Sequence, residues 1–233
     1  MNEHLKTSQN GLEFITKWEG CVLKPYKDVA GLRTIGVGHL IKSGENYPDG
    51  VSITKEQALE ILAKDVEHCE KSIYNNIQVP LNQNQFDALV SFGFNCGTGV
   101  YSSSGVASAL KIADYEAVPS KLEPWSKARV NGTMQTVQGL LNRRKDEGRL
   151  FSEPVDPDEQ VFEFPVPVSK DLLLEVQERL KKLNLYSLKV DGLWGPGTNA
   201  GVTTFAEKYG VTHEDPSKEI MYSFLVELRK ETA

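Results

Sequence analysis

The sequence predicts an α+β fold, in which a mostly helical domain with a small β-hairpin region precedes a small all-α module of three helices. Apolar side chains recur at helical spacing through most of the chain, whereas residues 34–40 alternate with glycines as a short hairpin does. The composition then changes in an acidic segment with four prolines, which cannot continue a helix. We therefore expect a first domain over residues 1–151, a linker over 152–168 and the module over 169–233.

The first domain is expected to open with a helix over about residues 7–19, which ends at Gly20 because glycine commonly stops helices. A turn at residues 28–31 then leads into the hairpin. Two later helices begin at capping-box signatures, in which a Thr or an Asn is followed three residues later by Gln. The helices expected after the hairpin cover about residues 54–69, about 82–96, shorter stretches within 104–123, and about 136–150.

The module is expected to contain three short helices around a thin core. Ser169 caps the first helix, the turn at Gly195–Gly197 leads into the second, and Ser217 opens the third. The module has no cluster of ionisable groups suited to catalysis, so we interpret it as a binding module. The residues expected to face its core are Leu172, Leu173, Val176, Leu180, Leu183, Val202, Phe205, Tyr209, Ile220, Phe224 and Leu228.

Charge and cysteine content exclude several classes of protein. Residues 1–150 carry 17 basic and 17 acidic side chains, so the net charge of −6 lies mainly in the five acids of residues 151–168. Because there is no basic face or arm, we expect no nucleic-acid partner. Three cysteines and four histidines lack the spacing of a disulfide framework or a metal site, and we expect no metal or cofactor. No stretch is typical of a signal peptide or a membrane span, which indicates a reduced, cytoplasmic chain without stable membrane association.

A candidate active site lies between the first helix and the hairpin. Glu19 follows Leu12 and Ile15 at helical spacing, on the side that normally turns inward. Burial there would favour its protonated form, as a general acid needs, whereas Asp28 in a polar turn would stay ionised. Thr34 could donate its hydroxyl to Asp28 and accept a hydrogen bond from a water. Taken singly, each of these residues also has an ordinary structural explanation, such as a surface glutamate or an Asx turn.

The stretch from Glu19 to His39 reads EGCVLKPYKDVAGLRTIGVGH and resembles the signature of the phage-type lysozymes, glycoside hydrolase family 24. The spacing of Glu19, Asp28 and Thr34, nine and then six residues, matches the catalytic triad of that family. Two later stretches, ALVSFGFNCGTG and GLLNRRKDEGRLF, resemble helices of the lambdoid-phage endolysins. The resemblance covers residues 5–151.

This resemblance implies a lysozyme-like fold and a muramidase, which hydrolyses the β-1,4 bond between N-acetylmuramic acid and N-acetylglucosamine in peptidoglycan. Glu19 would protonate the bridging oxygen, while Asp28 and Thr34 would hold the attacking water, or Asp28 would stabilise the oxocarbenium-like state. The resemblance also implies inversion of configuration, which requires carboxylates about 6.5–9.5 Å apart. Two alternatives stay open: a lytic transglycosylase that acts through Glu19 alone, and a non-catalytic wall-binding or virion protein.

The resemblance also implies residues that line a substrate cleft. Phe94 and Asn95 match a cleft-lining position of the family, although core packing for Phe94 and helix capping for Asn95 are equally expected. Leu40 and Ser104 are further candidates for the cleft on weaker grounds.

Three basic side chains near the site have two interpretations each. His39 is expected to be a structural hydrogen-bond or ion-pair partner rather than a catalyst. Arg143 and Arg144 could contact the carboxylates of peptide stems, but two adjacent arginines on a helix more commonly form a solvated face.

The stretch VQERLKKLNLYSLKVDGLWGPGTNAGVTTF, from Val176 to Phe205, resembles the peptidoglycan-binding type 1 module. Most of the matching positions are core or turn residues and therefore indicate the fold first. Trp194 and Asp191, in the turn, are the candidate wall contacts, and Trp194 could equally fill the core. The usual Gln after Phe205 is replaced by Ala206.

Together the two resemblances imply a modular phage endolysin that binds and cleaves bacterial peptidoglycan. Tethering a weak wall binder to a hydrolase raises the local concentration of the enzyme on an insoluble substrate. Such a protein is made in the host cytoplasm and would need a holin-type membrane lesion to reach the wall. We expect a monomer, and host-cell lysis as the result of its activity.

Overall fold

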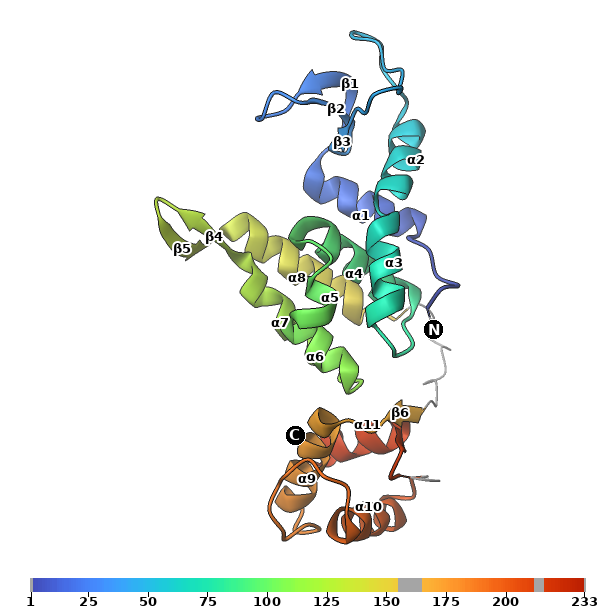
Figure 1. Ribbon diagram of the computed structural model, residues 1–233, viewed down its shortest axis with the longest axis vertical. Coiled ribbons are helices and arrows are strands. Elements are labelled where there is room, and N and C mark those ends of the chain that lie inside the picture. The colour runs from blue at the N-terminus through green and yellow to red at the C-terminus, as the bar shows by residue number, and fades with distance from the viewer. Residues whose placement is uncertain (1, 155–164, 212–215, 233) are drawn as a thin grey trace. The chain divides into compact units, whose positions relative to one another are not determined.

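A computed structural model describes residues 2–154, 165–211 and 216–232. Contacts between Cα atoms divide the chain into two compact units, the first made of residues 1–110 and 115–155 and the second chiefly of residues 156–233. Each unit has its own helices; the described part of the first has two small sheets and that of the second has one (Figure 1). Residues 155–164, the middle of the expected linker, lie outside the described residues.

The first unit opens with α1 (Gln9–Glu19), whose first turn is capped because the Ser8 hydroxyl accepts a hydrogen bond from the Gly11 N–H. Gly20 ends the helix as predicted, with a φ of +79° that glycine adopts without strain. Antiparallel strands follow in the order β1 (Val22–Lys27), β2 (Arg33–Gly36) and β3 (His39–Leu40). The predicted hairpin is confirmed as β2–β3, and β1 is an additional strand whose sequence, VLKPYK, does not alternate clearly and contains a proline.

Helices make up most of the rest of the first unit. Both predicted capping boxes are present, because Thr54 and Asn82 each exchange two hydrogen bonds with the Gln three residues later. The single helix predicted over 54–69 is wrong, because a turn at the fully buried Val66 divides it. The helices are α2 (Lys55–Asp65), α3 (Glu67–Asn76), α4 (Gln83–Cys96), α5 (Val100–Ser103), α6 (Gly105–Lys111), α7 (Val118–Leu122), the 3-10 helix η1 (Glu123–Ser126) and α8 (Gln138–Ser152).

A second hairpin, β4 (Lys127–Val130) and β5 (Thr133–Thr136), was not predicted. Its turn residues Asn131 and Gly132 have φ values of +48° and +82°, as a type I′ turn requires. Asn-Gly is a strong hairpin signal, but almost every residue of the two strands is exposed. The flanking sequence therefore lacks the alternation of apolar and polar residues that would have supported the signal.

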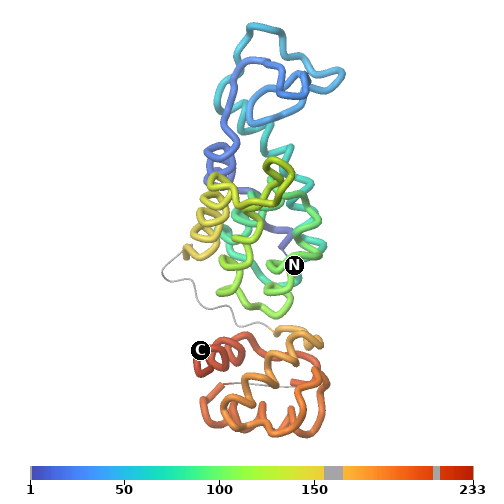
Figure 2. Tube along the Cα trace, turned by 90° about the vertical axis from the view of Figure 1, so that its left-hand side faces the viewer, coloured from blue at the N-terminus to red at the C-terminus, as the bar shows by residue number. Residues whose placement is uncertain are grey.

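The core of the first unit forms around α4, whose residues Phe86–Gly93 are all buried. Both α1 and α8 pack against this helix. Figures 1 and 2 show the three-stranded sheet at one end of the unit and helices α4 to α8 at the other, with α1 between them. Because α1 and α8 share α4 as a support, the end of α1 at Glu19 comes close to Arg143 on α8.

The second unit contains the three predicted helices, α9 (Lys170–Lys182), α10 (Pro196–Tyr209) and α11 (Tyr222–Glu231). The Ser169 hydroxyl caps α9 by accepting a hydrogen bond from the Leu172 N–H. Most of the predicted core residues are buried, whereas Leu183 and Tyr209 are only half-buried.

Two short strands, β6 (Pro165–Pro167) and β7 (Glu219–Met221), pair antiparallel in this unit and correct two predictions. Residues 165–167, which the composition places in the linker, belong to a strand, and Ser217 precedes a strand rather than opening a helix. The pairing sets the fully buried Val166 opposite the fully buried Ile220. Local sequence does not indicate this contact because its partners are far apart in the chain.

We expect the same substitution at two helical glycines to have opposite effects. A Cβ on Gly93 in α4 would overlap the buried Tyr101 hydroxyl, which donates to the Leu89 carbonyl at 2.8 Å, whereas a Cβ on Gly139 in α8 would meet nothing within 4 Å. Gly93→Ala should lower the free energy of unfolding by about 1–3 kcal/mol through overpacking. Gly139→Ala should raise it by about 0.5–1 kcal/mol through helix propensity. Urea unfolding measures both values, and equal effects would contradict the packing of Tyr101 on α4.

Candidate active site

Glu19 lies at the last position of α1, directly before the three-stranded sheet. Its carboxylate accepts a hydrogen bond from Arg143 of α8, with 2.5 Å between Oε1 and Nη1. The side chain is 28% exposed, so the expectation that it is buried at the end of an apolar stripe is wrong. Leu12 and Ile15 of the helix are buried as expected. Glu19, however, is the last residue of the helix, and its side chain there contacts the guanidinium of Arg143.

Asp28 follows β1 and shapes the turn between β1 and β2. Its Oδ1 accepts hydrogen bonds from the Ala30 N–H at 2.9 Å and the Leu32 N–H at 2.8 Å, and its own N–H donates to the Leu32 carbonyl. The structural interpretation of this residue as an Asx-type turn is therefore confirmed. Its Oδ2 has no hydrogen-bond partner among the described residues, and the side chain is half-buried.

Thr34 is 2% exposed and lies in β2, opposite Tyr26 of β1. Its hydroxyl donates to the Leu32 carbonyl at 3.1 Å and not to Asp28 as expected. A hydroxyl that donates its one proton to a carbonyl keeps lone pairs that can accept from another donor. The turn at Leu32 thus joins Asp28 and Thr34 in one hairpin, since both side chains bond to that residue's backbone.

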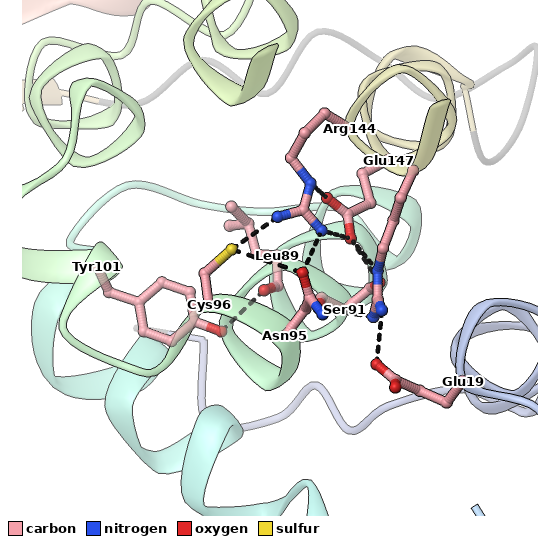
Figure 3. A network of polar contacts seen from close by, with 9 residues as sticks. Glu19, Leu89, Ser91, Asn95, Cys96, Tyr101, Arg144 and Glu147 are labelled. Carbon is pink, nitrogen blue, oxygen red and sulfur yellow. Dashed lines mark hydrogen bonds and ion pairs between the residues drawn. The ribbon is translucent and has the colours of Figure 1, made fainter. Parts of the chain in front are cut away.

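Glu19 contacts a cluster of charged side chains that is buried between α4 and α8 (Figure 3). Arg143, Arg144 and Glu147 of α8 are 4%, 0% and 0% exposed, so neither arginine belongs to a solvated helix face. Arg143 Nε lies 3.1 Å from Glu147 Oε1, and Arg144 Nη2 lies 2.9 Å from the same oxygen. The Ser91 hydroxyl of α4 donates to Glu147 Oε1 at 2.8 Å. Both guanidiniums are therefore bound to the buried Glu147 carboxylate.

Arg144 extends the cluster along α4. Its Nη2 donates to the Asn95 side-chain oxygen at 3.1 Å, its Nη1 lies 2.6 Å from Cys96 Sγ, and its guanidinium lies 5.2 Å from the centre of the Phe92 ring. Its Nε and Glu147 Oε2 are 2.8 Å apart, an ion pair without the angles of a hydrogen bond. Because its oxygen is occupied, the exposed Asn95 amide presents its NH₂ group to other partners.

Burial sets the protonation tendencies inside this cluster. Loss of solvent raises the pKa of the Glu147 carboxyl above its usual value, and both guanidiniums and the Ser91 hydroxyl oppose that rise. Burial likewise raises the pKa of the Cys96 thiol, which Arg144 counteracts. The cluster therefore depends on its cations to hold an ionised carboxylate in the core.

Leu40 and Phe94, two of the predicted cleft residues, come together at one pocket of about 310 Å³. Leu40 is 46% exposed on β3, and Phe94 is half-buried on α4. Ser104 does not fit the same prediction, because it is 4% exposed and its hydroxyl accepts from the Ala107 N–H to cap α6. The pocket is lined by Gly38, His39, Leu40, Lys42, Asp65, His68 and Phe94.

His39 is confirmed as a structural hydrogen-bond partner. Its Nδ1 lies 2.8 Å from Asp65 Oδ2 on α2, and its Nε2 lies 3.0 Å from Glu45 Oε2 in the loop after β3. The Lys42 N–H, and then His39, lower the pKa of the Glu45 carboxyl by hydrogen bonding. With both ring nitrogens occupied and 7% exposure, His39 fastens the sheet to α2 and to the following loop.

In the second unit, Asp191 has a structural role. Its Oδ1 accepts from the buried Gln177 amide at 3.1 Å and from the Leu193 N–H at 2.9 Å. The Gln177 oxygen in turn accepts from the backbone N–H groups of Asp191 and Gly192. Trp194 follows this turn and is half-buried. The turn is therefore fixed by internal bonds, and Trp194 keeps part of its surface exposed next to the 64% exposed Leu193.

No group of three or more His, Cys, Asp or Glu side chains could hold a metal ion in the part of the chain that the structure describes. His213 lies outside that part. None of the helices described there has the length and apolar character needed to cross a membrane. Cys21, Cys69 and Cys96 are free thiols.

Known proteins resemble the first unit. The model of a family described as phage lysozyme matches residues 16–147. The chain is 38% identical to an endolysin of Salmonella phage P22, over 63% of this chain and 98% of the relative. An endolysin from Escherichia coli O157:H7 phage FAHEc1 superimposes with a TM-score of 0.59 at 34% identity, over 67% of this chain and 99% of that one. The muramidase domain of SpmX from Asticaccaulis excentricus gives a TM-score of 0.57 at 31% identity, over 64% and 99%.

Proposed function

Because the chain belongs to the phage lysozyme family and is a lysozyme-type glycoside hydrolase, we propose that it is a muramidase with Glu19 as its general acid. Its substrate in this proposal is peptidoglycan, cleaved at the β-1,4 bond between N-acetylmuramic acid and N-acetylglucosamine. The observation that carries the proposal is the position of Glu19, at a helix end with one carboxylate oxygen held by Arg143. Its other oxygen has no bonding partner among the described residues and can hold the proton for the leaving oxygen.

Asp28 and Thr34 are proposed to hold the attacking water. Two backbone N–H groups fix Asp28 Oδ1, which leaves Oδ2 to accept a proton from that water as it attacks. The Thr34 oxygen accepts the water's other hydrogen, because its own proton is committed to the Leu32 carbonyl. This arrangement supports direct displacement by water, and hence inversion at the anomeric carbon.

Leu40, Phe94 and Asn95 are proposed to contact the glycan. Leu40 and Phe94 give their pocket the apolar surface on which a sugar ring can rest. The Asn95 NH₂ group, turned outward by the bond from Arg144 to its oxygen, can donate to an acetamido carbonyl. Ser104 does not belong to this set because its hydroxyl caps a helix.

The second unit is proposed to bind the wall and keep the hydrolase on its insoluble substrate. Residues 169–233 would form this module, with Trp194 as the contact, while Asp191 acts by holding the turn rather than by touching the wall. Synthesis in the host cytoplasm, passage through a holin-type lesion, a monomeric state and host lysis stay predictions from the sequence.

Mass spectrometry of muropeptides released from purified peptidoglycan tests the hydrolytic role of Glu19. The wild type should release fragments with reducible muramic-acid ends, and Glu19→Gln should lower the rate by about 10²–10⁴-fold because the general acid is lost. Glu13→Gln, a change of the same kind on an exposed residue of α1, is the matched control and should keep full activity.

Products with 1,6-anhydro ends, each one water lighter, would instead identify a lytic transglycosylase. Release of fragments by Glu19→Gln at the wild-type rate would remove Glu19 from the mechanism. Retained sedimentation on the wall without release by any variant would leave the non-catalytic binding protein.

Sedimentation with insoluble peptidoglycan tests the second unit. In a Glu19→Gln background, which keeps the wall intact, Trp194→Ala should weaken binding about tenfold because an aromatic contact is lost. Val226→Ala changes an apolar residue of α11 that is 38% exposed and should leave binding unchanged. Equal binding by the two variants would contradict the assignment of Trp194.

A further inference from the structure

We propose that Glu147 is a positioning residue for the catalytic acid: it shares the charge of Arg143 with Glu19 and, through Arg144, orients the amide of Asn95. This inference rests on the proposed role of Glu19 as general acid. It gives a function to a carboxylate that has no exposed surface and cannot touch the substrate. Glu147 acts through the two arginines, which contact Glu19 and Asn95.

The role of Glu147 follows from the contact between Glu19 and Arg143. A guanidinium at 2.5 Å favours the ionised form of a carboxylate, whereas a general acid has to carry a proton. Arg143 is 4% exposed, so water does little to reduce its field. A second anion on the same guanidinium reduces the net charge that Glu19 meets. Glu147 supplies that anion, at 3.1 Å from Arg143 Nε.

The geometry of Glu147 fits this role because its own position is over-determined. Oε1 accepts three hydrogen bonds, from the Ser91 hydroxyl, from Arg143 Nε and from Arg144 Nη2. Oε2 forms an ion pair with Arg144 Nε at 2.8 Å. Ser91 lies on α4, so this carboxylate is tied to both helices of the central packing. If Glu19 moved, Arg143 could move with it only by breaking its hydrogen bond to Glu147, which is held in place.

Stability alone does not account for such a cluster. Replacing a buried ion cluster with packed apolar side chains of similar volume is commonly neutral or stabilising. Here both arginines extend beyond Glu147 to residues of the proposed site, Arg143 to Glu19 and Arg144 to Asn95. The cluster thus links one buried carboxylate to an acid and to an amide (Figure 3).

The other charges around the cluster have partners of their own or lie elsewhere. Lys17 of α1 pairs with Asp146 of α8 at 2.9 Å. On α4, the Cys96 thiol faces Arg144. Glu123 of η1, with Lys145 and Arg149 of α8, lines a different pocket, and none of the three pairs with Glu147 in the described part of the chain. Arg143 is therefore the route from Glu147 to Glu19.

The pH dependence of hydrolysis by the full-length protein tests the proposal. With Glu147→Gln, Arg143 keeps a hydrogen-bond acceptor but has Glu19 as its remaining anionic partner among the described residues. The charge of Arg143 then acts on Glu19 alone and favours its carboxylate form at lower pH, so the alkaline limb of the kcat profile should move about one pH unit lower. At a given pH above that limb, kcat of Glu147→Gln should be about tenfold lower than kcat of the wild type. Soluble glycan chains from peptidoglycan serve as the substrate.

Asp87→Asn is the matched control. Asp87 lies on α4 and, like Glu147 on α8, is a buried carboxylate, with 1% exposure. Its hydrogen bonds go to Ser8 and Gln83 and not to Glu19 or Arg143. Its amide variant also loses a buried charge and should leave the limb in place. A merely structural role for Glu147 would give the two variants the same profile, which would overturn the proposal.

A double substitution tests whether Glu147 acts through Arg143. Arg143→Met removes the cation and should move the limb to higher pH, and adding Glu147→Gln should then move it by less than about 0.3 units. A full shift in the double variant would overturn the proposed route. If Glu147→Gln does not fold, as judged by circular dichroism, Arg144→Met replaces it. That variant leaves Arg143 as the remaining cation on Glu147 and should move the limb to higher pH, whereas no movement or the opposite movement would overturn the proposal.

Failure of the function itself gives a different result. If Glu19→Gln is as active as the wild type, the assignment of the general acid is wrong. If Glu19→Gln is inactive but the limb of Glu147→Gln stays in place, the function stands and the role of Glu147 is overturned.

Discussion

The buried charge cluster of Arg143, Arg144 and Glu147 is the interaction on which the site depends. Each member is almost or completely excluded from solvent, so each needs its partners in place. The cluster lies where α8 packs on α4, and its outer contacts are Glu19 and Asn95. A shift of α8 on α4 would therefore displace the neighbours of the acid as well as the core. The contacts that pack α8 on α4 in the folded first unit therefore also position the residues of the proposed site.

Local signals explain what the sequence could predict. Gly20 ends α1, and the capping boxes at Thr54 and Asn82 begin α2 and α4, because each depends on partners within a few residues. The burial of Arg143 and Arg144 could not be predicted in this way. Adjacent arginines on a helix are typical of a solvated face, and only packing against distant residues of α4 places them in the core. The strand pair β6–β7 was missed for the same reason.

The residues of the proposed site were predicted from a motif, but the motif did not predict their surroundings. Glu19 was expected among apolar side chains and instead meets a cation from a helix near the end of the unit. Asp28 builds the turn with one oxygen, which leaves the other oxygen for the proposed contact with the water. Thr34 bonds to a backbone carbonyl rather than to Asp28, which leaves its oxygen as an acceptor. Spacing along the chain thus predicted the candidate residues, and tertiary packing decided what each one bonds to.

In the proposed reaction, a water held by Asp28 and Thr34 attacks while Glu19 protonates the leaving oxygen. The most direct measurement is the anomeric configuration of the first product, followed by proton NMR before mutarotation on soluble glycan chains. Direct attack by water inverts the anomeric carbon, so the new N-acetylmuramic acid end should form first as the α anomer. A β anomer formed first would mean two displacements through a covalent glycosyl-enzyme, and would contradict the assignment of Asp28 and Thr34 to the water.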